Sequence, residues 1–371
     1  MRADIDGYAD RFLLAVVAYP FGDERKAGQL AELADNLSPA GIIRMAENAT
    51  YHELIPLLHI VAGDCAQLGY PLPLPGRMLE KWSQVYEREL VRSAVIHHGA
   101  QKALSALEDA GVRTIPLKGS YLTSRFYQKG GARSYRDLDL LVEKGSLQAL
   151  NNALLGAGFQ PHPGRPSFVP APAYTVYFLP MEDSDVMMEI DIHIGMHWPK
   201  EYFQKTSFRS EDIWAEAARD NMDDLPVWAM SPAHLVITTF LDCAVNHRYA
   251  RLIKFRDIIE VIRAAEVDWD EVESWSDRWG VRSFVGPGLK LLSEMDPGVP
   301  IPPQVVSSLL PSYPMMRLFL NVLPATALPD HRGRSFSLLN LLFFMLGDTL
   351  GERARGLAYL PYHMFRGRRK F

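Results

Sequence analysis

Cysteine is scarce in this sequence: only Cys65 and Cys243 occur among 371 residues. Neither residue has a CxxC or cysteine–histidine neighbourhood, so the sequence predicts no disulfide framework and no zinc site. Two buried thiols in a reducing compartment are the expected state. The acidic N-terminal segment MRADIDGYAD also lacks the apolar core of a signal peptide. Together these absences predict a cytoplasmic protein.

Long apolar runs and a large excess of positive charge are missing as well. The longest apolar run, residues 338–346, contains Asn340 and is far shorter than the roughly 20 residues of a membrane-spanning helix. The formal net charge is −5, which gives no indication of a nucleic-acid-binding surface. No internal repeat or low-complexity tract is present. The composition is that of an ordinary globular chain, long enough for about two or three domains.

The C-terminal tail is where basic residues gather. After Gly351 a single Glu352 stands against six basic residues, namely Arg353, Arg355, Arg366, Arg368, Arg369 and Lys370. Aromatic residues such as Tyr359 and Phe365 lie between them. Weak contact with an anionic membrane surface or with a nucleic acid is one interpretation of this pattern, and a solvated terminal segment is the simpler one.

The apolar pattern divides the chain into helical and strand-containing regions. Helical spacing dominates up to about residue 110 and predicts one long helix from about Met78 to Ala110, ended by Gly111. Short strands and helical segments then alternate, and helical spacing returns after residue 200. We therefore predict an α+β protein with four regions: a helical N-terminal region (1–110), a strand-containing core (111–200), a helical C-terminal domain (201–330) and the basic tail (331–371).

One stretch of the predicted core, residues 114–142, is dense in polar groups. An apolar strand ends in Lys118-Gly119-Ser120, a short helical segment follows, and Asp137-Leu138-Asp139 opens the next strand. Because side chains alternate along a strand, Asp137 and Asp139 lie on one face. Two like charges this close are costly unless a cation neutralises them. The stretch therefore predicts a site for a metal ion and phosphate.

A later strand supplies a third carboxylate. Residues 186–194 have the sequence VMMEIDIHI, in which Glu189, Asp191 and His193 share one face. We expect this strand to lie beside the strand that begins at Asp137. Asp191 is the preferred third carboxylate and Glu189 the alternative. His193 is either part of the site or a structural hydrogen-bond partner of a carboxylate.

These residue types suit phosphoryl or nucleotidyl transfer, which needs charge neutralisation and in-line placement more than covalent help from the protein. Mg²⁺, with Mn²⁺ as the alternative, binds carboxylate oxygens and keeps some of its waters. In this hypothesis Asp137 and Asp139 hold the ion that carries a triphosphate. Asp191 helps to hold a second ion and acts as the base for an acceptor hydroxyl.

Backbone and basic groups around the carboxylates complete the predicted site. The N–H groups of Gly119 and Ser120 open a helix and suit the β- and γ-phosphates of a nucleoside triphosphate. Lys118 adds a point charge. Arg133 and Arg136 are expected either to neutralise the departing pyrophosphate or to form ordinary salt bridges.

These motifs resemble the DNA polymerase beta-like nucleotidyltransferase superfamily and, more narrowly, an uncharacterised bacterial nucleotidyltransferase family. That family has L-K-G, R-x-x-x-D-h-D-h-L-V and D-h-H motifs, matched here by residues 117–119, 133–142 and 191–193. Its helical C-terminal half has a histidine and a basic–aromatic–Asp pattern, matched by His247 and residues 254–257. The resemblance covers about residues 40–265. It implies a small mixed sheet with helices, Mg²⁺ and a nucleoside triphosphate donor, with ATP as the first choice.

The sequence thus predicts an enzyme that moves a nucleoside monophosphate from a nucleoside triphosphate to an unidentified acceptor, either a small molecule or a peptide or protein. A phosphotransferase with the same metal site is a second enzymatic interpretation. The non-catalytic alternative is a degenerate relative that binds a nucleotide or a partner protein. The presence of all three carboxylates favours the enzyme.

Overall fold

The computed structural model describes residues 2–162, 174–180, 187–196, 207–322, 346–348, 351 and 353. Most of the basic tail lies outside these residues, so its role stays a prediction, as does the division into four regions. In the described part of the chain, no helix is long and apolar enough to cross a membrane. The chain splits into two compact units: a helical unit (Met1–Met78, Trp198–Phe208 and Pro232–Phe371) and a sheet unit (Leu79–His197 and Arg209–Ser231).

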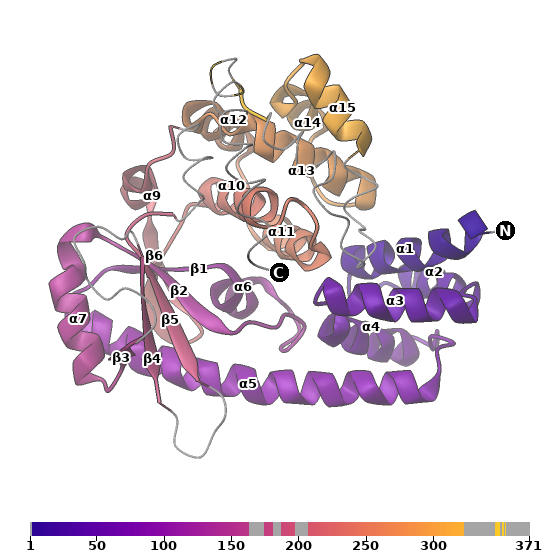
Figure 1. Cartoon of the computed structure of the whole chain (residues 1–371), viewed down its shortest axis with the longest axis horizontal. Coiled ribbons are helices and arrows are strands. Elements are labelled where there is room, and N and C mark those ends of the chain that lie inside the picture. The colour runs from indigo at the N-terminus through magenta and orange to yellow at the C-terminus, as the bar shows by residue number, and fades with distance from the viewer. Residues whose placement is uncertain are drawn as a thin grey trace, which may run out of the picture. The chain divides into compact units, whose positions relative to one another are not determined.

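The sheet unit is built on a five-stranded sheet (Figure 1). Its strands are β1 (Thr114–Leu117), β2 (Asp137–Val142), β3 (Gln160–Pro161), β4 (Tyr174–Leu179) and β5 (Met188–His193). They lie in the order β1-β2-β5-β4-β3; β2 and β5 pair in parallel, whereas the other neighbouring strands are antiparallel. The predicted α+β class with a small mixed sheet is confirmed.

The helices of the sheet unit include the predicted long helix. They are α5 (Gly76–Asp109, in this unit from Leu79 onward), α6 (Lys118–Phe126), α7 (Leu147–Gly156), α9 (Ser210–Glu216) and the 3-10 turn η1 (Lys144–Ser146). Gly111, just beyond α5, has a φ of 68°, the left-handed conformation expected after a helix end. The long helix from about residue 78 to 110 is therefore confirmed.

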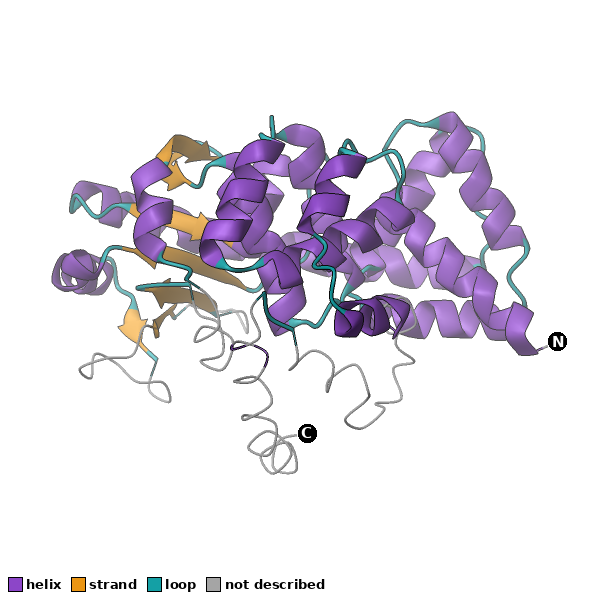
Figure 2. Cartoon of the chain, turned by 90° about the horizontal axis from the view of Figure 1, so that it is seen from above, coloured by secondary structure: helices purple, strands orange, loops and turns teal. Residues whose placement is uncertain are grey.

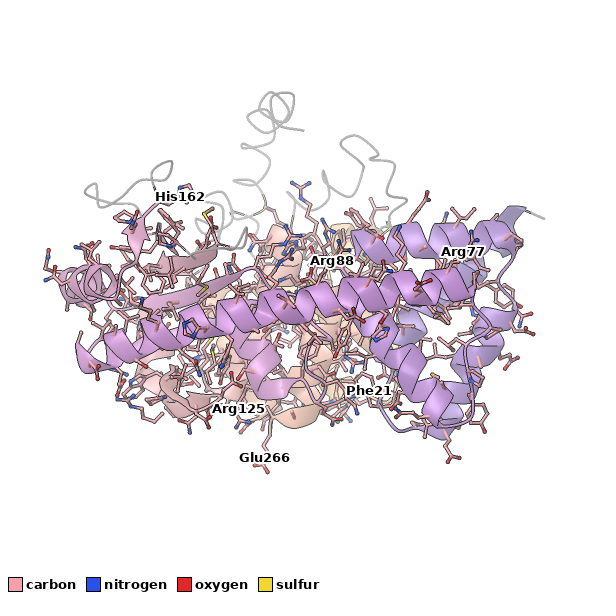
Figure 3. The ribbon with its side chains drawn as sticks, turned by 90° about the horizontal axis from the view of Figure 1, so that it is seen from below. Phe21, Arg77, Arg88, Arg125, His162 and Glu266 are labelled. Carbon is pink, nitrogen blue, oxygen red and sulfur yellow. The ribbon has the colours of Figure 1, made fainter. Side chains whose placement is uncertain are left out.

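Packing of α5 decides which face of β5 is buried. At Gly99 of α5 an added Cβ would lie 2.5 Å from Cγ of Met188, so the helix and the strand approach as closely as a glycine permits. Figure 3 shows α5 along its whole length, with Arg88 labelled on it. Because side chains alternate, Asp191 and His193 lie on the face of the sheet opposite Met188.

A hairpin of β6 (Ala218–Met222) and β7 (Leu225–Ala229) also belongs to the sheet unit. The sequence analysis predicts only helices after residue 200, so this pair of strands is a correction. The signal for it is the turn Asp223-Asp224 between two short alternating segments. Asp223 has a φ of 53°, a conformation that Asp tolerates better than most residues.

The hairpin anchors α6, the helix that begins at Lys118. Tyr121 Oη donates to Asp220 Oδ2 at 2.9 Å, and Ser124 Oγ donates to Asp223 Oδ1 at 2.7 Å. Arg125, labelled in Figure 3, adds a hydrogen bond from Nε to Asp220 at 3.0 Å. These contacts hold one side of α6 and thereby fix the start of the helix.

The helical unit consists of two groups of helices that are far apart in sequence; Figure 2 draws the helices of the chain in purple. The first is α1 (Arg2–Ala18), α2 (Glu24–Asp35), α3 (Pro39–Tyr51) and α4 (Ile55–Gln67). The second is α10 (Pro232–Leu241), the π-helix η2 (Asp242–Asn246), α11 (Leu252–Ala264), α12 (Trp269–Trp279), α13 (Arg282–Met295), α14 (Pro303–Leu309) and α15 (Pro314–Val322). Ser38 Oγ accepts from the N–H of Gly41 at 3.0 Å and Pro39 opens α3, the helix start that the sequence predicts.

A buried arginine joins the two groups. Arg256 of α11 is 1% exposed, and its Nη1 donates to the main-chain carbonyls of Val17 at 3.0 Å and Tyr19 at 2.6 Å. Glu260, one turn further along α11, pairs with the same guanidinium. Carbonyls at a helix C-terminus lack partners within the helix, so a cation there satisfies them. The end of α1 is thus tied to α11.

Candidate active site

Asp139 and Asp191 lie directly opposite each other on two neighbouring strands. In the parallel pairing of β2 and β5, Asp139 is the partner of Asp191, and Asp137 is the partner of Glu189. The apolar residues between them are fully buried, namely Leu138, Leu140, Ile190 and Ile192. Burying this apolar set fixes the register, because a slip by one residue would turn it to the polar face. The expected pairing of the two strands is confirmed.

Asp139 is the buried centre of the polar face. It is 4% exposed, and its Oδ1 lies 2.7 Å from Lys118 Nζ and 2.7 Å from His193 Nε2. Burial alone would raise the pKa of Asp139, but the hydrogen bonds from His193 and Lys118 outweigh it and hold the pKa below its usual value. Asp139 is therefore ionised at neutral pH.

The pKa of Asp137 is shifted in the opposite direction. Burial, together with the negative charges of Asp139 and Asp191, raises the pKa of Asp137 to about 6, although Lys118 opposes the rise. Three aspartates, Asp137, Asp139 and Asp191, thus lie around one lysine. A divalent cation would supply the missing positive charge, so these residues fit a metal-dependent site.

Three ligand atoms in this region are close enough to hold one metal ion. They come from Asp139, Asp191 and His193, and all lie within 4.8 Å of one another. Asp137 is not part of this group. The structure therefore brings together two of the three predicted metal ligands and adds His193. The sequence predicts His193 as part of the site or as a hydrogen-bond partner of a carboxylate, but not as a metal ligand. The ligand set Asp137, Asp139 and Asp191 stays a prediction.

Glu189, the alternative third carboxylate, has different neighbours. Its Oε1 lies 3.7 Å from Nε2 of His162, which follows β3 and is labelled in Figure 3. In the strand register it faces Asp137 rather than Asp139. Asp191 is thus the carboxylate of β5 that meets Asp139.

The backbone turn at Lys118 places the lysine side chain next to Asp139. Leu117, the last residue of β1, is the register partner of Asp139. Lys118 then has a φ of 56°, a left-handed conformation that costs a residue with a Cβ about 1–2 kcal/mol. The N-cap residue Leu117 makes no side-chain hydrogen bond to the first turn of α6. The start of α6 therefore has backbone N–H groups suited to an anionic ligand.

Gly119 is favoured by close packing rather than by its own φ. A Cβ added at Gly119 would lie 3.0 Å from Cβ of Tyr135 and 3.7 Å from Nη2 of Arg133. The segment that leads into β2 thus packs onto the first turn of α6. Ser120, the next residue, is 2% exposed. The sequence analysis predicts a glycine turn here, but not that the unusual backbone angle belongs to Lys118.

The two arginines before β2 differ in environment. Arg133 is 5% exposed and donates to the main-chain carbonyl of Ser134, whereas Arg136 is exposed. Arg133 also lies next to Gly119, as the packing above shows. Their assignment to pyrophosphate stays a prediction.

The residues matched to the family pattern in the C-terminal half belong to the helical unit. Asp242 Oδ2 lies 2.7 Å from Lys254 Nζ and 3.8 Å from His247 Nε2, and Asp242 Oδ1 accepts from Asn246 Nδ2 at 2.8 Å. Asp257 is 1% exposed. The carboxylate of Asp242 is thus paired with one lysine and one amide.

A mixed sheet with paired carboxylates on one strand, a third opposite them on a parallel neighbour, and a Lys-Gly-Ser turn opening a helix is the arrangement expected of a nucleotidyltransferase fold. A comparison with protein-family models agrees: residues 39–296, more than half of the chain, match the model described as "Uncharacterised nucleotidyltransferase". The chain belongs to this family of uncharacterised nucleotidyltransferases.

Comparison with solved structures finds several further similarities, two of which follow. One is to an antigenic nucleotidyltransferase-like protein from Paracoccidioides brasiliensis, with 18% identity, a TM-score of 0.37, and coverage of 59% of this chain and 91% of that one. The other is to JHP933 from Helicobacter pylori, with 9% identity, a TM-score of 0.31, and coverage of 63% and 93%. Both TM-scores are too low to support conclusions about function. No curated protein matches the chain.

Proposed function

We propose that the protein is a metal-dependent nucleotidyltransferase that moves a nucleoside monophosphate from a nucleoside triphosphate to an acceptor. ATP is the first donor to test, and the acceptor is a small molecule or a peptide or protein with a free hydroxyl. The observation that carries the proposal is the register of β2 and β5, which sets Asp139 opposite Asp191 with Asp137 on the same strand face. Both described cysteines are free and buried, consistent with a reducing cytoplasm as the location.

The proposed reaction is a substitution at the α-phosphorus. The acceptor oxygen forms a bond to this phosphorus, the bond to the oxygen that bridges to the β-phosphorus breaks, and pyrophosphate leaves. Asp191 takes the proton of the acceptor hydroxyl. Asp137 and Asp139 would hold the Mg²⁺ or Mn²⁺ of the triphosphate, and the bound metal would supply charge neutralisation along the phosphates.

Groups around the carboxylates have proposed roles in holding the donor. Gly119 and Ser120 offer the backbone N–H groups of the first turn of α6 to the β- and γ-phosphates. Lys118 adds a positive charge beside them. Arg133 and Arg136 would stabilise pyrophosphate. His193, whose Nε2 lies 2.7 Å from Oδ1 of Asp139, belongs to the groups proposed for cofactor binding.

The test uses ATP with ³²P in its α-phosphate. This ATP is incubated with the protein, Mg²⁺ or Mn²⁺, and a cell extract as the source of acceptor, and the transfer of label to an acceptor is measured. Wild-type protein should transfer label only when a divalent ion is present, and Asp191→Asn should lose the transfer. Glu143→Gln is the matched control, because Glu143 directly follows β2 and pairs with Arg113 at 3.4 Å. Full transfer by Asp191→Asn would contradict the proposal.

The same experiment separates the alternatives. Transfer of label from the γ-phosphate instead of the α-phosphate would identify a phosphotransferase. A rise in melting temperature with ATP and metal, without transfer of either label, would identify a nucleotide-binding relative that has lost catalysis. Absence of both binding and transfer with every nucleoside triphosphate would remove the nucleotide hypothesis altogether.

A further inference from the structure

The metal-binding group in the sheet unit contains a nitrogen donor. Asp139 and Asp191 contribute carboxylate oxygens from β2 and β5, and His193 contributes an imidazole from β5 two residues beyond Asp191. His193 is 3% exposed and lies on the same strand face as Asp191. Its ring is therefore held inside the site by the strand itself.

We infer that the position formed by Asp139, Asp191 and His193 binds a first-row transition-metal ion, such as Mn²⁺, Co²⁺ or Zn²⁺, in preference to Mg²⁺. This inference rests on the proposed function and specifies its second metal position. Mg²⁺ binds oxygen donors and sheds its waters reluctantly, whereas imidazole is a favoured ligand of the transition metals. The pair Asp137 and Asp139 offers oxygen alone and suits Mg²⁺, so the two positions differ in donor chemistry.

The present contacts of His193 are compatible with this role. Nε2 of His193 and Oδ1 of Asp139 are 2.7 Å apart. Two donor atoms that each lie about 2.1 Å from one ion, at right angles, are about 3 Å apart. A shared ion would therefore replace the direct contact with little movement of either side chain. A metal ion binds the nitrogen lone pair of a neutral imidazole ring.

Lys118 occupies the place of a cation in the absence of the metal. Its Nζ lies 2.7 Å from the same Oδ1 of Asp139, and its side chain is 33% exposed. An ion on this carboxylate would repel the ammonium group, and the partly exposed side chain has room to turn away. The site therefore has an exchangeable cation already in position.

A different role for His193 predicts a different result. If His193 only orients Asp139 by hydrogen bonding, its loss weakens the binding of all divalent ions by a similar factor. If His193 is a ligand, its loss weakens the transition-metal ions much more than Mg²⁺. The ratio of affinities, measured without nucleotide, thus distinguishes a ligand from an orienting residue.

The experiment is calorimetric titration of the full chain with Mn²⁺, Zn²⁺ and Mg²⁺ separately. Comparison variants are His193→Gln and His162→Gln; His162 is a half-buried histidine beside Glu189, outside the three-ligand group. We expect His193→Gln to reduce the ratio of Mn²⁺ to Mg²⁺ affinity at least about tenfold, and His162→Gln to leave it unchanged. The Co²⁺ complex of the wild type should also show visible absorption bands that change in His193→Gln.

Equal losses for Mn²⁺ and Mg²⁺ in His193→Gln, or unchanged Co²⁺ bands, would overturn the inference. Melting curves of each metal-free variant check that the comparison is made on folded protein. Failure of nucleotide transfer with an intact, His193-dependent metal preference would overturn the proposed function alone. Transfer with no metal preference would overturn only the present inference.

Discussion

Two clusters in this chain, each built around a buried aspartate, contain the same three side-chain types but differ in their neighbouring charges. The sheet cluster is Asp139, Lys118 and His193, and the helix cluster is Asp242, Lys254 and His247. In each cluster a lysine Nζ lies 2.7 Å from an aspartate oxygen, and a histidine Nε2 lies near the same carboxylate. Composition alone would give the two clusters the same function.

The sheet cluster differs from the helix cluster in having two further aspartates beside it. Asp137 and Asp191 adjoin the sheet cluster, and the pKa of Asp137 is raised to about 6 by burial and by its two negative neighbours. In the helix cluster, burial dominates and lowers the pKa of His247 to about 4, so the histidine is neutral at pH 7 and Asp242 is balanced by Lys254. The sheet cluster therefore gathers three aspartates around one lysine, which suits a cation, whereas the carboxylate of Asp242 is paired with Lys254.

The strongest test of this contrast is the same substitution in both clusters. Asp139→Asn keeps the shape of the side chain but removes a charge, and nucleotide transfer should fall about 10³-fold, or about 4 kcal/mol of transition-state stabilisation. Asp242→Asn should retain transfer within about tenfold when measured on folded protein. Transfer of α-phosphate label measures both. Equal losses of nucleotide transfer in the two variants would contradict the proposed difference between the clusters.

Asp242→Asn should reduce stability more than Asp139→Asn does. Asp242→Asn leaves Lys254, whose side chain is 10% exposed, buried without a charged partner, and should lower stability by about 3 kcal/mol. The midpoint of thermal unfolding measures the loss. The double variant Asp242→Leu/Lys254→Met removes both charges and should recover most of it. No recovery would mean that the pair contributes more than mutual neutralisation.

The pH dependence of metal binding should follow Asp137. Below its pKa of about 6 a metal ion must displace a proton from this carboxyl, so divalent-ion affinity should fall about tenfold for each further pH unit. In the metal-free protein the raised pKa favours the protonated fold, so this stability is present below about pH 4 and lost as the pH rises through 6. Titration calorimetry between pH 5 and pH 7.5 measures the affinity. Asp137→Asn is the control and should flatten the profile; a flat wild-type profile would contradict the assignment.

The smallest expected effect concerns the two lysines. Lys118→Met removes the cation that competes at Asp139 and should tighten Mn²⁺ binding about tenfold in the absence of nucleotide. Lys254→Met, in the balanced cluster, should leave Mn²⁺ affinity unchanged while lowering the melting temperature. Weaker Mn²⁺ binding by Lys118→Met would show that Lys118 organises the site instead of competing for it.

Local signals were sufficient for much of the structure. The apolar stripe of α5, the Ser38-Pro39 helix start and the alternation along β2 and β5 depend on neighbouring residues alone, and each predicted element is present. The hairpin of β6 and β7 is not predicted from the sequence, because its strands are short and follow a helical segment. Its turn at Asp223 is a weak signal without knowledge of its tertiary partner α6.

The sequence by itself determined the residue types of the candidate site: two aspartates on one strand face, a third carboxylate and a histidine on another, and a Lys-Gly-Ser turn. Period-two alternation is a local property of the chain, so these faces could be assigned without the fold. Only the tertiary structure decided that Asp191, rather than Glu189, lies opposite Asp139, and that Lys118 and His193 share one oxygen of Asp139. Strand register and burial are set by long-range packing of apolar side chains, and they decide which charged groups come to lie next to one another.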